Sequence, residues 1–174
     1  MTRAIDLAVR ELQPSDVAAY KALRDHALTH YEDAFTSDAA TEAQRTAQSY
    51  ASRLGAGADG SFTLGAFLGD RLIGAVTCER DPRSKVRHLG HVTAMMVYRD
   101  EQGRGVGRAL IDALIQRAAA DPELHQLTIN VTAGNAVAEG LYGRAGFVRY
   151  GTLPRAIRVG GRFLDKHHLL LQLK

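Results

Sequence analysis

The fold is decided by the stretch Met95-Met96-Val97-Tyr98-Arg99-Asp100-Glu101-Gln102-Gly103-Arg104-Gly105-Val106-Gly107-Arg108-Ala109-Leu110, in which an apolar strand leads through a short polar turn into a glycine-rich helix start. We expect Gly103, Gly105 and Gly107 to adopt backbone angles that a side chain would forbid, and to bring N–H groups close to a ligand. The helix that follows offers free amide donors and a partial positive charge, which together favour an anion. The stretch therefore predicts a phosphate-binding loop.

The loop does not fit two common nucleotide-binding patterns. A dinucleotide-binding turn would have G-x-G-x-x-G near the first strand of the chain, with an acidic residue about 20 positions later. Residues 103–107 give G-x-G-x-G instead, late in the chain, and no Gly-Lys-Ser/Thr follows as a P-loop requires. On this loop alone, a tight turn without a ligand stays open.

The composition is that of one globular domain, which we expect to span residues 1–174. The chain is 45% hydrophobic and 24% charged, and it is long enough to bury an ordinary core. Its net charge of +3 could attract a phosphorylated cofactor or an acidic partner. The basic residues are scattered and only 6% of residues are aromatic, which argues against a nucleic-acid partner.

Targeting and redox signals are few. No apolar run approaches the roughly 20 residues that span a bilayer, and Met1–Asp6 is too polar for a secretory signal peptide. We therefore expect a cytoplasmic protein with no membrane partner. Cys78 is the single cysteine, so no intramolecular disulfide can form, and its strand-like surroundings predict a packed core thiol.

The first half of the chain predicts one strand, two helices and a hairpin. Pro14 to Asp16 is typical of a helix start, and helical spacing follows from Val17 to Leu28. The Gly69-Asp70 pair predicts a tight turn between two strands. The expected elements are a strand at 7–12, helices from 14 and over 41–54, a loop at 55–60, and strands at 62–68 and 71–77.

The second half predicts alternating strands and helices. In the helix from Gly105, an apolar face comprises Val106, Leu110, Ala113, Leu114 and Ala118, and Asp121-Pro122 ends that helix. The other expected elements are strands at 89–98, 126–131, 147–150 and 162–173, and a helix at 135–144. This order indicates a mixed α/β or α+β single domain.

A second motif lies in the helix predicted at 135–144. Asn135 comes seven residues before Tyr142, which is about two helical turns, so both side chains lie on one face. Asn135 can cap the helix or bind a ligand amide, and Tyr142 offers a phenol that can donate and accept.

Together these two motifs resemble the GNAT superfamily of acetyl-CoA-dependent N-acetyltransferases. The first is Gln102-x-x-Gly105-x-Gly107, which is similar to the family's pyrophosphate loop. The second is Asn135-Ala136-x-Ala138-x-x-Leu141-Tyr142-x-x-x-Gly146-Phe147, which is similar to its later Asn…Leu-Tyr…Gly-Phe segment. The resemblance implies a single-domain α/β (α+β) fold whose central sheet is mixed, mostly antiparallel, and splayed between strands four and five.

The resemblance also implies how acetyl-CoA is held as cosubstrate. Backbone groups of Met96 and Val97 would pair with the pantetheine arm, and Asn135 would contact it as well. Backbone amides would hold the pyrophosphate, from residues Gln102, Gly103, Arg104, Gly105, Val106, Gly107 and Arg108. Arg104 and Arg108 either add charge near the phosphates or are solvated helix-start side chains.

Acetyl transfer needs a neutral amine, an oxyanion donor and an acid for the thiolate. In the family, a tyrosine in the later motif commonly supplies that proton, so Tyr142 is the candidate acid; alternatively it is a packed helical aromatic. Histone-type relatives carry a glutamate eleven residues before the loop's first Gln, where this chain has His91. His91 is either the general base or hydrogen-bonded structure.

No metal site is expected from the histidines. His167 and His168 are adjacent on a predicted strand, so their side chains point to opposite faces. His26 and His30 have helical spacing but lack a recognisable third ligand.

The expected function is an N-acetyltransferase that acts on a primary amine of a small molecule or peptide. The acceptor would approach opposite the cofactor, at a face lined by the first two helices, the loop Asp81–Arg87 and the last hairpin. A catalytically silent acyl-CoA-binding regulator of the same fold is the alternative, and a nucleic-acid-binding module is a third. The last strand, if exposed, is compatible with a homodimer.

Overall fold

A computed structural model of the chain describes residues 7–55, 57 and 59–174. Residues 1–6, on which the signal-peptide prediction rests, lie outside the described residues, as do Ala56 and Ala58 of the predicted loop. None of the helices within this part of the chain is long and apolar enough to cross a membrane.

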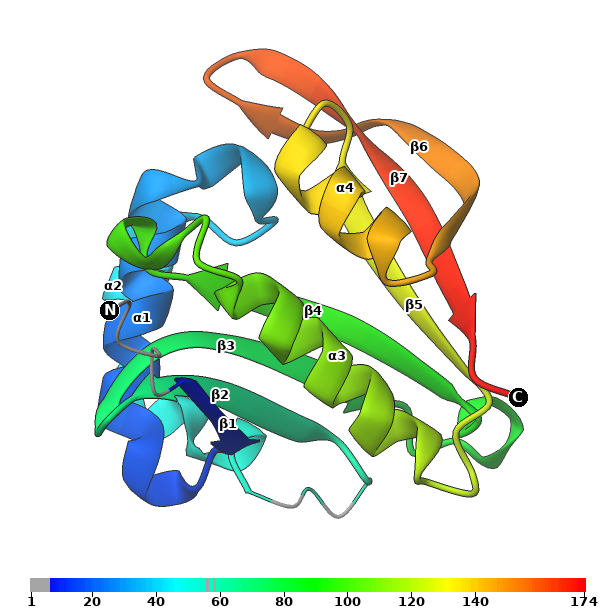
Figure 1. Cartoon of the computed structure of the whole chain (residues 1–174). Helices are drawn as coiled ribbons and strands as arrows, with labels where there is room; N and C mark the ends of the chain where they lie inside the picture. Colours follow the sequence, from blue (N-terminus) through cyan, green and yellow to red (C-terminus); the bar gives the residue numbers. More distant parts are fainter. Residues whose placement is uncertain (1–6, 56, 58) are drawn as a thin grey trace, which may run out of the picture.

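One mixed sheet of seven strands forms the centre of the molecule, in the order β1-β2-β3-β4-β5-β7-β6 (Figure 1). Neighbouring strands are antiparallel except for β4 and β5, which are parallel. The strands are β1 (Leu7–Glu11), β2 (Phe62–Leu68), β3 (Arg71–Arg80), β4 (Leu89–Val97), β5 (Gln126–Thr132), β6 (Val148–Val159) and β7 (Arg162–Gln172). The predicted mixed, mostly antiparallel sheet is confirmed.

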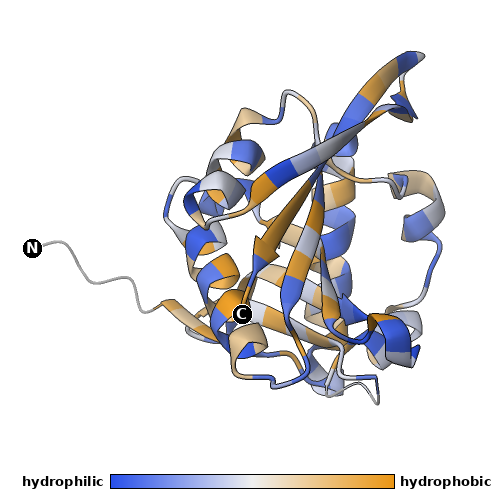
Figure 2. Cartoon of the chain, turned by 90° about the vertical axis from the view of Figure 1, so that its right-hand side faces the viewer, coloured by the Kyte–Doolittle hydropathy of each residue, from blue (hydrophilic) through white to orange (hydrophobic). Residues whose placement is uncertain are grey.

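Two layers of helix cover the sheet. The helices α3 (Val106–Ala119) and α4 (Ala136–Arg144) lie on one face, and α1 (Val17–His30) lies on the other (Figures 1 and 2). The β6–β7 hairpin extends beyond both layers as an arm (Figure 2). Each layer packs on its own apolar cluster, so the sheet separates two cores.

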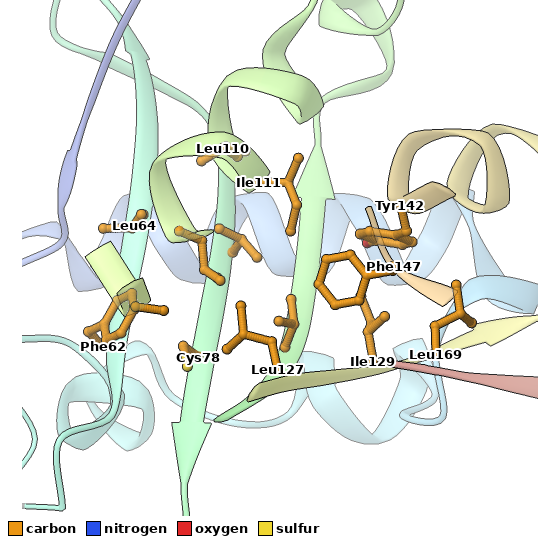
Figure 3. Close-up of a cluster of buried hydrophobic side chains, with 14 of the residues drawn as sticks. Phe62, Leu64, Cys78, Leu110, Ile111, Leu127, Ile129, Tyr142, Phe147 and Leu169 are labelled. Atoms are coloured by element: carbon orange, nitrogen blue, oxygen red, sulfur yellow. The ribbon is translucent and has the colours of Figure 1, made fainter. Parts of the chain in front are cut away.

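The larger core lies under α3 and α4. Four residues of the predicted apolar face are buried there, namely Val106, Leu110, Leu114 and Ala118. Ala113 is only partly buried, and Ile111, which was not predicted, is fully buried. Tyr142 and Phe147 lie at one end of this cluster, next to Ile129 and Leu169 (Figure 3). The helix that follows the glycine loop is therefore fixed to the sheet along its apolar face.

The predicted second helix over 41–54 is wrong in extent. The chain forms a short helix α2 (Ala39–Ala43), capped by Asp38, and then a 3-10 segment at Ala47–Arg53. Thr46 between them is extended, with φ −72° and ψ 153°. A hydrogen bond of 2.5 Å from Tyr50 Oη to Glu42 Oε2 joins the two pieces, which explains the break physically.

The strand predicted at 147–150 is also too short, since β6 continues to Val159. Pairing with β7 shifts between Leu153 and Ile157, where Arg155 has φ +53°. Pro154 and this irregularity interrupt the alternating pattern, which is why the sequence hides the second half of the strand.

Candidate active site

The sheet opens between β4 and β5. Their pairing starts at Leu89 opposite Gln126 and stops at Val92 opposite Ile129. Beyond this point β4 still pairs with β3, through Met96 and Val97. The backbone groups of β4 that face β5 therefore have no partner in that strand over the last residues of β4, as an added extended segment would require.

A local irregularity turns the end of β4 into this gap. The register between β3 and β4 shifts between Ala75 and Thr77, and Ala94 has φ +50°, a conformation that non-glycine residues rarely adopt. Such bulges re-aim side chains and end regular pairing beside functional sites.

The glycine loop follows β4 and leads into α3. Gly103 and Gly105 have φ of +72° and +82°, and a Cβ added to either would meet nothing within 4 Å. The first backbone bond of α3 runs from Ala109 N to Gly105 O, so the N–H groups of the first turn have no partner within the helix. The loop thus presents open backbone donors at a helix N-terminus, where an anion is favoured.

Gly107 has a different role from the one predicted. Its φ is not positive and it lies within α3, and a Cβ there would lie 3.4 Å from Leu141 Cδ2 of α4. Gly107 therefore does not shape the turn, and a side chain there would make only an ordinary contact with α4.

Both arginines of the loop have carboxylate partners. Arg104 Nη1 donates to Glu101 Oε2 at 2.7 Å, and Arg71 holds the other oxygen of this buried glutamate at 2.9 Å. Arg108 Nε donates to Asp112 Oδ2 at 2.6 Å. The charge that these arginines could direct at a phosphate is therefore partly neutralised.

Asn135 caps α4, which is one of the two roles that the sequence left open. Its Oδ1 accepts from Ala138 N at 3.2 Å, while Glu139 Oε1 accepts from Gly134 N at 3.1 Å. These two bonds fix the start of α4 beside the gap in the sheet.

Tyr142 is 4% exposed and packs edge-on against Phe147, with ring centroids 5.8 Å apart. Burial raises the pKa of its phenol, so the hydroxyl is protonated at neutral pH. Tyr142 also lines the cavity described below. The packed ring is as the second alternative expected, and the role of general acid stays a prediction.

His91 lies on β4 beside Thr128 of β5, and its Nδ1 is 2.8 Å from Thr128 Oγ1. The Thr128 hydroxyl also lies 3.5 Å from Gly90 O. Because Nδ1 is engaged by Thr128, Nε2 is the ring nitrogen without a hydrogen-bond partner among the described residues. Burial lowers the pKa of His91, and the nearby Glu79 acts in the opposite direction. The ring is therefore neutral at physiological pH, as a base must be.

A single cavity of about 900 Å³ joins these groups along the gap. On the α3 side its walls include Gln102, Gly103, Gly105 and Arg108 of the loop, but Arg104 is not among them. The end of β4, Asn135 and Tyr142 form the middle. On the α1 side its walls come from separate segments and include Arg24, Tyr31, Thr36, Arg53, Glu79, His91, Asn130 and Lys166.

The sequence reasoning missed most of the α1 side. Arg24 is buried and donates from Nε to Glu42 Oε2 at 2.8 Å, and Glu42 also accepts from Tyr50. Burial opposes ionisation of Glu42, but these hydrogen bonds and the charge of Arg24 lower its pKa to about 2. A polar residue on an apolar helix face, as at Arg24, was the only signal that could have indicated this network.

The loop Asp81–Arg87, which the sequence placed on the acceptor face, does not line this cavity. Arg87 O accepts from Arg80 Nη2 at 2.6 Å, and the Arg87 side chain binds Glu123 at 3.0 Å. These bonds hold the loop at the start of β4, whereas the gap lies at its end.

The paired histidines make unrelated contacts. His26 and His30 stack with centroids 4.1 Å apart, and His26 Nε2 accepts from Arg99 N. His167 Nδ1 is 2.8 Å from Thr152 Oγ1, while the ring of His168 lies 6.0 Å from that of Tyr150. Opposite-facing neighbours on β7 are what the strand geometry predicted.

Cys78 is fully buried in the larger core, and burial raises the pKa of its thiol to about 12. The predicted packed core thiol is confirmed, because a thiol in this state forms no reactive thiolate at neutral pH.

The family model for the acetyltransferase (GNAT) family matches residues 20–147. The chain belongs to this family, which uses acetyl-CoA, and the resemblance expected from the two motifs is confirmed.

Individual relatives and structures are consistent with this assignment. The L-methionine sulfoximine/L-methionine sulfone acetyltransferase of Pseudomonas aeruginosa is 39% identical over 74 residues, 42% of this chain and 42% of that protein. A GNAT-family acetyltransferase structure from Streptococcus pneumoniae has a TM-score of 0.81 and 26% identity, over 96% of this chain and 99% of that one. A Salmonella typhimurium structure with its cofactor acetyl-CoA has a TM-score of 0.80 and 22% identity, over 97% and 95% of the two chains.

Proposed function

We propose that this chain moves an acetyl group from acetyl-CoA to a primary amine, by direct attack in a ternary complex. The observation that supports this most is the continuity of the cavity. It joins the free edge of β4 and the open start of α3 to Tyr142 and His91, so two reactants could meet at the gap. Both reactants held together need no covalent enzyme intermediate.

The proposed placement of acetyl-CoA uses backbone more than side chains. Met96 and Val97 would pair with pantetheine as an added strand, and Asn135 would contact the same arm from the start of α4. The amides of Gln102–Arg108 would hold the pyrophosphate. The open space around Gly103 and Gly105 is compatible with this placement.

The proposed chemistry assigns one proton transfer to each candidate. Acetyl-CoA, when bound, supplies the activated carbonyl and the sulfur leaving group. As the C–N bond forms and the C–S bond breaks, Tyr142 donates a proton to the sulfur. His91 accepts a proton from the attacking nitrogen through Nε2 and releases it to solvent. Tyr142 regains a proton from solvent, so one proton leaves the amine and one reaches the sulfur in each turnover.

The first amines to test are L-methionine sulfoximine and L-methionine sulfone, because the relative from Pseudomonas aeruginosa is named for them. Purified protein with acetyl-CoA and a panel of amines should release free CoA thiol. Tyr142→Phe should lower kcat by about 10²-fold or more, since general acids commonly contribute this much.

Tyr150→Phe is the matched control, because Tyr150 lies on the β6–β7 arm, is 60% exposed and does not line the cavity. Unchanged turnover in Tyr142→Phe would remove Tyr142 from the role of acid. Tight CoA binding by calorimetry without transfer to any amine would instead support the silent regulator.

A further inference from the structure

Lys166 is a half-buried cation at the wall of the cavity. It lies on β7 opposite Thr132 of β5, and its Nζ donates to Thr36 Oγ1 at 2.7 Å. No carboxylate of residues 7–55, 57 and 59–174 forms an ion pair with it. An ammonium has three donors, so two remain for a ligand. A cation held partly out of water without a counterion favours an incoming anion.

The neighbouring charges leave this side of the cavity electropositive. Arg53 also lines it and, among the described residues, has no carboxylate partner, whereas Arg24 is neutralised by Glu42. Glu79 is the carboxylate on this wall without an ion pair in the described chain. Two uncompensated cations against one carboxylate suit a ligand that carries negative charge.

Two more polar groups on the same wall lack partners. Tyr31 Oη and Thr93 Oγ1 are buried without a hydrogen-bond partner in the described part of the chain, and both residues line the cavity. Since a buried hydroxyl without a partner is unfavourable, the unused hydrogen-bonding capacity of these two hydroxyls suits a polar ligand on this wall.

The anion for Lys166 is not the pyrophosphate of the cosubstrate. Thr36 belongs to the segment after α1, so Lys166 faces the α1 side of the sheet, whereas the glycine loop opens at the start of α3 on the other face. Glu79 and His91 pair across β3 and β4 on the α1 side too, and the charges of Glu79 and Lys166 both act on the pKa of His91. Lys166 and His91 therefore line the same side of the cavity, and an acceptor with its amine at His91 would meet the charge of Lys166 there.

We propose that the acceptor is a primary amine that also carries a carboxylate, and that Lys166, positioned by Thr36, binds this carboxylate. The proposal rests on the proposed acetyltransferase function and adds the chemical class of its acceptor. His91 and Glu79 receive the amine, and Lys166 receives the carboxylate on the same side of the cavity, which Arg53 also lines.

The experiment compares L-methionine sulfone with its carboxamide, which differs at the carboxylate alone. Wild-type protein should show kcat/KM at least about tenfold higher for the acid, because hydrogen bonds to charged groups contribute about 1.5–3 kcal/mol. Lys166→Met should raise KM for the acid about tenfold and remove this preference. KM for the carboxamide and for acetyl-CoA should not change, and Lys166→Arg should restore part of the preference.

Two further variants separate recognition from folding. Lys85→Met removes an exposed lysine that does not line the cavity, and it should behave as wild type. Thr36→Val keeps the ammonium but removes its one hydrogen bond, so it should raise KM for the acid a few-fold at unchanged kcat, even where Lys166→Met proves unstable.

Calorimetry with CoA bound gives a readout that needs no turnover. The proposal is supported if the wild-type protein binds the acid and Lys166→Met does not. It is overturned if the wild-type protein binds the acid and the carboxamide equally well. If amines are acetylated without preference for the acid, the acceptor class is wrong and the function stands. If no amine is acetylated, the function fails, and the calorimetric comparison still decides the role of Lys166.

Discussion

The two sides of the cavity are built in different ways. The α3 side comes from one continuous stretch, from the end of β4 through Gly103 and Gly105 to the start of α3, and its donors are mainly backbone amides. The α1 side comes from side chains on α1 and the stretch after it, on the 3-10 segment Ala47–Arg53, and on strands β3, β4, β5 and β7, among them Arg24, Glu79 and Lys166. One side depends on local conformation and the other on the whole fold.

Because of this difference, the two sides should tolerate side-chain substitutions to different degrees. A loop whose donors are amides keeps its chemistry through most side-chain changes, provided that its glycines stay. A compartment of side chains changes its charge and shape with each substitution, and it can select among ligands for that reason. We infer that the α3 side determines the reaction and the α1 side determines its acceptor.

The largest effect is expected from breaking the buried ion pair that supports the α1 side. Arg24→Met leaves the buried Glu42 carboxylate without its main partner, so unfolding free energy should fall by about 3–5 kcal/mol. Urea denaturation measures this. Arg45→Met is the control, because Arg45 binds the same glutamate at 3.3 Å from an exposed position and should cost less than about 1 kcal/mol. Equal losses of unfolding free energy in both variants would show that burial does not make the Arg24–Glu42 pair more stabilising than the Arg45–Glu42 pair.

The next effect concerns His91, a titrating group on the α1 side. His91→Asn keeps a donor near Thr128 but removes the base, so kcat/KM should fall by about 10²-fold. Only the neutral imidazole accepts a proton, so activity should rise with pH through its pKa. Burial lowers that pKa, which moves the acid limb below the ordinary value of about 6.5.

The pH profile of kcat/KM checks this, with His88→Asn as control, since His88 does not line the cavity. An acid limb that persists unchanged in His91→Asn would assign it to another group and make His91 a structural residue.

A smaller effect should follow from disturbing the backbone of the α3 side. Gly105→Ala requires alanine at φ +82°, which costs about 1–2 kcal/mol, so CoA affinity should fall about tenfold by calorimetry. Gly143→Ala is the matched control, because Gly143 has helical backbone in α4 and an added Cβ meets nothing within 4 Å. If both variants bind CoA as wild type does, the loop does not need its left-handed residue.

The same contrast explains what the sequence could predict. The glycine spacing after an apolar strand records backbone conformation directly, so the loop, α3, and the cap at Asn135 could be located from residues alone. The break at Thr46 could not, because helical spacing continues through it and only the tertiary bond between Glu42 and Tyr50 reveals it. Gly107 also looked like a turn residue, but it lies inside α3 without a positive φ, and its residue type alone does not reveal this.

The proposed acceptor site on the α1 side could not be predicted from the sequence for a related reason. Lys166 is one polar residue in a strand with polar neighbours on both sides, and nothing local distinguishes it from a solvated lysine. Its place at the cavity is visible only in the folded chain, where β7 pairs with β5 and Thr36, in the segment after α1, accepts a hydrogen bond from its Nζ. Such a site is assembled by topology, which a motif does not record.

The smallest effect is expected from the loop's own charges, and it tests the contrast most directly. If backbone amides hold the pyrophosphate, then Arg108→Gln should weaken CoA binding less than about threefold, because Arg108 is half exposed and already paired with Asp112 at 2.6 Å. Calorimetry at two salt concentrations measures the loss, with Arg117→Gln as a control on the same helix outside the cavity walls. A loss of tenfold or more that shrinks with added salt would mean that side-chain charge carries the α3 side, and the two sides would then differ in location but not in how they bind.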